Sequence, residues 1–124
     1  MLKNNRDDFN QCAAVLLELL YQEFPKETDV VVDDLVKYLN EDMMDNYFAT
    51  IRFLQRERLI HYQALNYFTF SGVVLTAKGL RILDTIPDSF QEKTIVQQIS
   101  HALAGESKQA IGQVIQEVIR ISVD

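Results

Sequence analysis

Apolar residues recur every three or four positions along most of this chain, which is the spacing of helices with one buried face. The first such stretch starts after Asp7 or Asp8, either of which can cap a helix, and ends before Pro25. A polar loop (26–29) and a β-branched strand (30–32) follow it. Asp33 then caps a predicted short second helix over residues 34–39. This part of the chain therefore predicts the order helix, strand, helix.

A third helix is predicted to begin near Asp45, after a polar turn at 40–42. From residue 60 to 75 the pattern changes to aromatic and β-branched residues, interrupted at 65–66 and at 71–72. This pattern predicts a hairpin of two strands. Thr76 is placed to cap a fourth helix, and Pro87 separates that helix from the rest.

Two further helices are predicted after Pro87. The fifth opens at Asp88 or Ser89 and stops at Gly105, which suits a left-handed C-cap. The sixth runs from about residue 107 to 121 and carries a broad apolar stripe made of Ile111, Val114, Ile115, Val118 and Ile121. The predicted fold is mainly α with a small β-hairpin.

The residues of the third helix and the hairpin resemble a known family. Residues 51–60 (IRFLQRERLI) are similar to the end of the recognition helix in MarR- and PadR-type transcriptional regulators. Residues 75–79 (LTAKG) look like the Leu-Thr-x-Lys-Gly signature that closes the wing in those families. The resemblance implies a winged helix-turn-helix domain over residues 1–86. Residues 87–124 would then be a two-helix extension, either part of the same compact unit or a dimerisation element.

The chain departs from this family at two places. Arg58 stands where the family usually has Gly, so the third helix lacks its preferred left-handed residue. The predicted wing, residues 62–71, contains no Lys or Arg, whereas wings that touch DNA usually bring a cation to a groove or a phosphate. An aromatic wing of this kind is typical of a surface that is half core and half protein interface.

Composition limits the class of protein. The 124 residues are 48% hydrophobic and 24% charged, which fits one globular domain. The single cysteine, Cys12, favours a reducing cytoplasm, and no apolar run is long enough to cross a membrane. The net charge is −6, but residues 46–83 hold five basic side chains and one acidic one. A surface that faces a polyanion would therefore lie in the middle third of the chain.

The sequence predicts neither catalysis nor a cofactor. His61 and His101 share no motif, Cys12 lies on an apparent core stripe, and no phosphate loop or metal-spaced cluster is present. The doublets at 7–8 and 33–34 are interpreted as helix caps rather than paired catalytic acids. We expect no enzyme, no metal site and no identifiable small-molecule ligand.

The middle of the chain predicts binding of double-stranded DNA. Arg52, Arg56 and Lys78 are expected to contact phosphates, and Asn46 and Thr50 are expected to approach base edges from the same helix. The alternative is a winged-helix protein interaction module without DNA binding.

The alternative follows from the uncharged wing. It places Tyr62 or Tyr67 at an exposed interface, with Phe68 and Phe70 at least partly buried.

The sixth helix predicts self-association. Ile111, Val114, Val118 and Ile121 recur with the spacing of a helical seam, and Ile115 widens that seam. A homodimer would set two recognition helices about one DNA turn apart. The alternative is a monomer in which this stripe packs on the first helix and completes the core.

Overall fold

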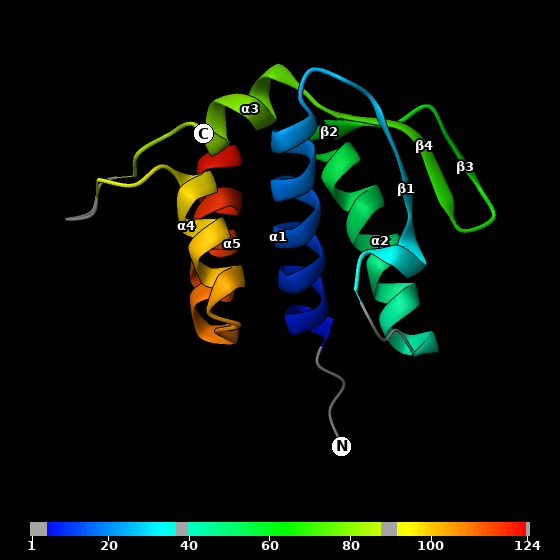
Figure 1. Cartoon of the computed structure of the whole chain (residues 1–124), viewed down its shortest axis with the longest axis horizontal. Coiled ribbons are helices and arrows are strands. Elements are labelled where there is room, and N and C mark those ends of the chain that lie inside the picture. The colour runs from blue at the N-terminus through cyan, green and yellow to red at the C-terminus, as the bar shows by residue number, and fades with distance from the viewer. Residues whose placement is uncertain (1–4, 37–39, 88–91, 124) are drawn as a thin grey trace.

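Helix α1 (Asn5–Glu23) is the central element of the molecule. The computed structural model describes residues 5–36, 40–87 and 92–123. Figure 1 shows α1 between a pair of helices on one side and the sheet with helix α2 on the other. Its buried residues lie on more than one face, including Cys12, Ala13, Leu16 and Leu17, because neighbours cover it from both sides. Asp7 and Asp8 lie in the first turn rather than at the cap, so their predicted capping role is wrong.

The sheet is small, antiparallel and centred on its longest strand. Strand β4 (Thr69–Leu75) pairs with β1 (Thr28–Val31) on one side and with β2 (Ile60–His61) and β3 (Ala64–Asn66) on the other. The β3–β4 turn lies at Tyr67 and Phe68, two residues later than predicted, with Tyr67 at a φ of 57°. The predicted break at 71–72 is a local irregularity inside β4, where Gly72 has a φ of 66°. A mainly helical chain with a small antiparallel hairpin is confirmed.

The predicted second helix differs from the structure. Residues Val32–Asp34 form one turn of 3-10 helix (η1), and the chain bends at 35–36. The described part of the predicted helix is therefore not α-helical, and residues 37–39 lie outside the described residues. Asp33 lies inside the turn, and no side chain caps it. The β-branched run that precedes the turn favours extended backbone, which delays helix formation.

Helix α2 (Glu41–Arg56) begins four positions before the predicted start. The side chain of Asn40 accepts a hydrogen bond from the amide of Met43 and caps it. At its other end the amide of Leu59 donates to the carbonyl of Leu54, and the amide of Arg58 donates to that of Gln55. This is a Schellman motif, and Arg58 occupies its left-handed position with a φ of 64°.

Helix α3 (Ala77–Leu83) is fixed against the end of α2. Thr76 caps it as predicted, accepting from the amide of Gly79 and donating its hydroxyl to the carbonyl of Arg58. The backbone of Gly79 passes so close to Leu59 that a Cβ there would lie 2.1 Å from the Leu59 carbonyl oxygen. The Thr-x-x-Gly spacing at 76–79 is therefore explained by this close approach.

Helices α4 (Ile95–Ala104) and α5 (Lys108–Ser122) form the pair on the other side of α1. The cap of α4 is Thr94, in a reciprocal capping box with Gln97, so α4 begins later than predicted. The predicted capping residues Asp88 and Ser89 lie outside the described residues. At the end of α4, Gly105 has an ordinary helical φ of −83° and Glu106 takes the left-handed conformation. The predicted role of Gly105 is therefore wrong by one position.

The apolar stripe of α5 belongs to the core of a single chain. Ile111, Val114, Ile115 and Val118 are at most 4% exposed, and Ile121 is partly buried against them. Contacts from α1, α3 and α4 cover this face. The first four residues have no surface left for a second subunit, so their assignment to a dimer interface is corrected. The described part of the C-terminal extension supplies one wall of the core through α4 and α5.

Candidate functional site

The expected base-reading face of α2 is turned toward α1. The amide of Asn46 donates to Asp8 Oδ2 at 2.7 Å and to Asn5 Oδ1 at 3.0 Å. Thr50 is 3% exposed, and its hydroxyl donates to the carbonyl of Asn46 at 2.7 Å. The Asn46 contacts join α2 to α1. The burial of Thr50 leaves it no surface with which to contact a base edge.

The three predicted phosphate contacts have different environments. Arg52 and Arg56 are exposed on α2, and the Arg56 guanidinium lies 5.6 Å from the centre of the Phe53 ring. Lys78 is partly buried, and its Nζ donates to the carbonyl of Glu57 at 3.3 Å, at the end of α2. Three exposed arginines therefore lie in the second half of α2 and just after its end: Arg52, Arg56 and Arg58.

The hairpin carries an exposed pair of aromatic residues that we call the aromatic tip, Tyr67 and Phe68. Tyr67 is 94% exposed and Phe68 is 51% exposed. Phe70 is fully buried. Tyr62 is half-buried, and the centre of its ring lies 4.8 Å from the centre of the Phe70 ring. The predicted burial of Phe70 and exposure of Tyr67 are confirmed, whereas Phe68 is exposed over half of its surface.

Tilted ring contacts connect Phe68 of the aromatic tip to the core. The centre of the Phe48 ring on α2 lies 6.2 Å from that of the Phe68 ring and 5.7 Å from that of the Phe70 ring. The carbonyl of Phe68 also accepts a hydrogen bond from the amide of Val32. Phe68 is thus held by α2 and η1, although half of its side chain faces solvent.

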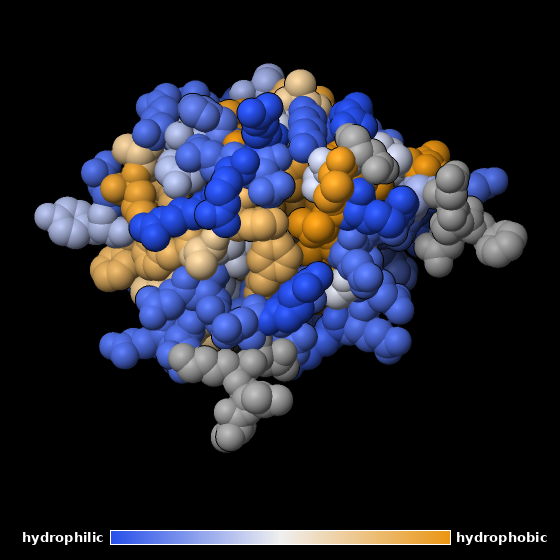
Figure 2. Space-filling model, turned by 180° about the vertical axis from the view of Figure 1, so that it is seen from behind, coloured by the Kyte–Doolittle hydropathy of each residue, from blue (hydrophilic) through white to orange (hydrophobic). Residues whose placement is uncertain are grey.

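A groove of about 420 Å³ lies between α1, α2 and α5. The rings of Phe9 and Phe53 meet in it edge to face, with their centres 5.4 Å apart. The Arg6 guanidinium lies 5.8 Å from the centre of the Phe9 ring. Figure 2 shows an apolar band across the rear face of the molecule, with hydrophilic residues above and below it. The sequence placed Phe9 in the core and did not identify this groove, because its walls come from distant parts of the chain.

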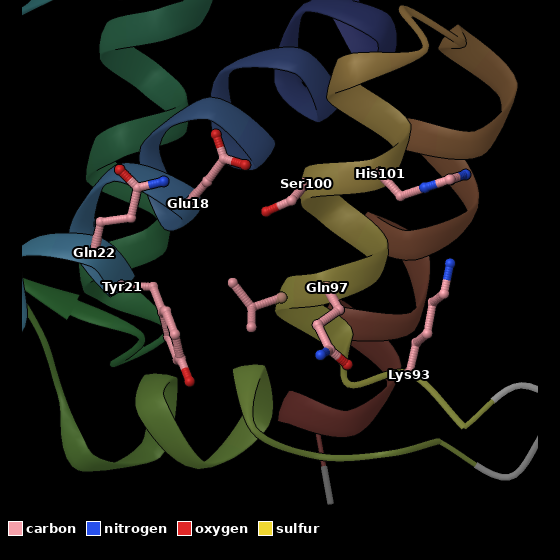
Figure 3. A pocket seen from close by; sticks show the side chains of 8 residues that line it. Glu18, Tyr21, Gln22, Lys93, Gln97, Ser100 and His101 are labelled. Atoms are coloured by element: carbon pink, nitrogen blue, oxygen red, sulfur yellow. The ribbon is translucent and has the colours of Figure 1, made fainter.

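A second groove, of about 580 Å³, lies between α1 and α4, and most of the residues that line it have polar side chains (Figure 3). The Tyr21 hydroxyl donates to Asp84 at 2.6 Å, and this hydrogen bond raises the pKa of Tyr21. Ser100 points toward the α1 side of the groove, whereas the neighbouring His101 points away from it (Figure 3). The two side chains therefore do not form a nucleophile and base pair.

Two titratable side chains, Cys12 and Tyr47, lie in the core. Cys12 is fully buried, and burial raises the pKa of its thiol, which keeps it protonated. Burial also raises the pKa of Tyr47. No group of three or more His, Cys, Asp or Glu side chains within residues 5–36, 40–87 and 92–123 is arranged to hold a metal ion.

No family model, curated protein or solved structure matches this chain. None of the helices in the described part of the chain is long and apolar enough to span a membrane.

Proposed function

We propose that this chain is a winged-helix protein interaction module that uses the aromatic tip as its anchor. The observation that carries the proposal is the exposure of Tyr67 and Phe68 on a hairpin without charge: residues 62–75 contain no Asp, Glu, Lys or Arg. Aromatic side chains dominate the energetics of protein interfaces, and charged residues are depleted at their centres. The complementary partner is a protein with an apolar pocket for one or two rings.

The rigid base of the hairpin supports this proposal. Because Phe68 packs on Phe48, and Phe48 on the buried Phe70, the Phe68 side chain of the aromatic tip is supported before a partner arrives. A preformed anchor loses less conformational entropy on binding than a flexible one. The resemblance to winged-helix regulators adds the expectation that this hairpin is the wing.

Binding of duplex DNA is the second candidate, and the exposed Arg52, Arg56 and Arg58 favour it. It is weaker than the first because Asn46 is hydrogen-bonded to α1, Thr50 is buried and Lys78 binds the end of α2. The homodimer expected from the sequence stays a proposal that now lacks its predicted interface on α5.

Two double variants distinguish the candidates. In quantitative affinity purification from the source cells, Tyr67→Ser/Phe68→Ser should abolish capture of a specific protein that Arg52→Ala/Arg56→Ala retains. In a duplex DNA binding assay at low salt, the arginine variant alone should reduce affinity if DNA is the ligand. Both variants change exposed side chains, so thermal melting should confirm that each is folded. Equal capture by the native chain and the Tyr67→Ser/Phe68→Ser variant would contradict the proposal.

A further inference from the structure

The groove between α1, α2 and α5 has an apolar lining to which all three helices contribute. Phe9 lies on α1, Ala49 and Phe53 on α2, and Ile119 on α5. We call it the Phe9–Phe53 groove. Its volume of about 420 Å³ falls in the usual range of small-molecule sites, about 300–1,000 Å³, and such sites are mostly apolar with a few polar groups. The aromatic tip does not line this groove, so the two surfaces are separate.

Two exposed arginines, Arg6 and Arg56, border the Phe9–Phe53 groove. Among the described residues that line it there is no Asp or Glu, and neither guanidinium forms an ion pair with another described residue. The whole chain carries a net charge of −6, so this groove differs in sign from the average of the molecule. Two cations beside an apolar surface favour a ligand with an anionic head and an apolar body.

The other hydrogen-bonding side chains of the groove are already engaged with the protein. The amide of Asn46 donates to Asp8 and Asn5, and the hydroxyl of Thr50 donates to the carbonyl of Asn46. The two guanidinium groups remain as the charged donors for a ligand. A guanidinium that lies over a ring keeps its N–H groups in its own plane, so it can hold that position and still donate to a carboxylate.

The arrangement of the two rings favours an aliphatic body over a flat one. The planes of Phe9 and Phe53 meet at 80°, and a guanidinium lies over each ring, 5.8 Å from the centre of Phe9 and 5.6 Å from that of Phe53. These contacts occupy ring surface that a planar ligand would need for offset stacking. An alkyl chain needs only apolar contact, and its rotatable bonds let it follow two surfaces that meet at a steep angle.

We propose that the Phe9–Phe53 groove binds a medium-chain aliphatic carboxylate. The carboxylate accepts hydrogen bonds from Arg6 and Arg56, and the alkyl chain packs on Phe9, Phe53 and Ile119. The chain supplies most of the affinity, because apolar burial grows with every methylene whereas a solvent-exposed ion pair adds little. The arginines select the sign of the head group. The proposal is independent of the aromatic tip.

Isothermal titration calorimetry of the full chain with sodium decanoate, kept below its micelle concentration, tests this proposal. We expect one saturable site. Octanoate has two methylenes fewer and should bind about fivefold to tenfold more weakly. The planar carboxylate 2-naphthoate has the same charge and should bind more weakly than decanoate by at least about fivefold, because the rings leave it no free face for stacking.

The variant Arg6→Glu isolates the contribution of the head group. It replaces an attraction by a repulsion at an exposed position, so it should lower the affinity for decanoate by about tenfold. Arg81→Glu makes the same change of net charge at an exposed position of α3 outside the groove, and it should bind decanoate like the native chain. Arg6 has no part in the DNA-binding candidate, so the two tests do not overlap.

A second pair of variants tests the groove itself at Ala49, an exposed lining residue. Ala49→Glu and Ala49→Gln introduce side chains of equal size that differ in charge. The Glu variant should bind decanoate at least about threefold more weakly than the Gln variant, because its carboxylate repels that of the ligand. Thermal melting confirms that each variant is folded.

Four results would overturn the proposal. The first is the absence of saturable decanoate binding at millimolar concentration, and the second is equal affinity for decanoate and octanoate. The third is unchanged decanoate affinity in Arg6→Glu together with equal affinity in the two Ala49 variants. The fourth is tighter binding of 2-naphthoate than of decanoate, which would assign the groove to planar ligands.

Discussion

Arg58 and Glu106 each end a helix in the left-handed conformation that glycine adopts most easily. Their φ values are 64° and 53°. In both places the amide of the left-handed residue and the amide of the next residue donate the two hydrogen bonds of a Schellman motif, from Arg58 and Leu59 in one and from Glu106 and Ser107 in the other. The hydrogen bonds hold the backbone in place although the side chain makes this conformation unfavourable.

Replacing Arg58 by glycine should therefore stabilise the protein. The left-handed conformation costs an L-residue about 1–2 kcal/mol, part of which glycine returns as entropy in the unfolded chain, so we expect a net gain of about 0.5–1 kcal/mol. Arg52→Gly, in the exposed middle of α2, is the matched control and should lose about 1 kcal/mol. Urea unfolding measures both changes. Equal destabilisation by the two substitutions would show that Arg58 is not strained.

Gly79 is the position least able to accept a side chain. Gly79→Ala should destabilise the protein by at least about 2 kcal/mol, because a Cβ at 2.1 Å from the Leu59 carbonyl oxygen forces α3 away from the end of α2. Gly105→Ala is the control, since its Cβ would meet nothing closer than 3.6 Å and its φ is helical. Chemical denaturation midpoints compare them, and similar midpoints for both variants would refute the steric explanation.

At the scale of the element, hydrophobic periodicity identified the segments that form helices more successfully than it identified the surfaces that those helices contact. The stripe on α5 was recognised from its spacing, but spacing is the same whether a stripe packs on its own chain or on a second copy. The position of α1 in the middle of the fold decides the matter, because it leaves an uncovered side that α4 and α5 fill.

Removing one side chain from the α5 stripe should accordingly destabilise the single chain. Ile115 is fully buried, so Ile115→Ala should lower the free energy of unfolding by about 2–5 kcal/mol. Gln116→Ala, on the exposed side of the same helix, should change it by less than about 0.5 kcal/mol. Thermal unfolding at two protein concentrations completes the test. A melting temperature that rises with concentration would instead indicate that α5 is stabilised by a second copy.

The short elements were harder to predict than the long ones. The expected second helix is one 3-10 turn in its described part, and the hairpin turn falls at Tyr67 and Phe68, which are not typical turn residues. Pairing with β4 sets the ends of β2 and β3, and pairing between distant residues leaves no local signal. Thr76 was predicted correctly because a helix cap is a local feature.

At the scale of the whole molecule, the sequence predicted the charge of the candidate site better than its orientation. Arg52 and Arg56 are exposed as expected, but Asn46 faces the acidic start of α1 and Thr50 is buried. Residue spacing places these side chains on one helix without fixing how that helix is rotated in the fold.

The burial of Cys12 should also make the protein less stable at alkaline pH. The thiol of Cys12 ordinarily has a pKa of 9.0, and burial raises that pKa in the folded chain, so above this pH the unfolded chain releases a proton that the folded chain keeps. Stability from this group is fully present below the unfolded pKa and is lost as pH rises. The free energy of unfolding should therefore fall by up to about 1.4 kcal/mol per pH unit above about pH 9.

The variant Cys12→Ala separates this effect from general alkaline damage. It removes the titrating thiol, so its unfolding free energy should fall less steeply between about pH 9 and 10 than that of the native chain. The substitution also changes core packing, but that change lowers stability equally at all pH values and leaves the slope as the informative quantity. Tyr47, whose pKa burial raises from 10.0, adds its own loss at higher pH in both proteins. Identical slopes for Cys12→Ala and the native chain would show that the thiol already titrates in the folded state, and hence that the core around α1 opens to solvent.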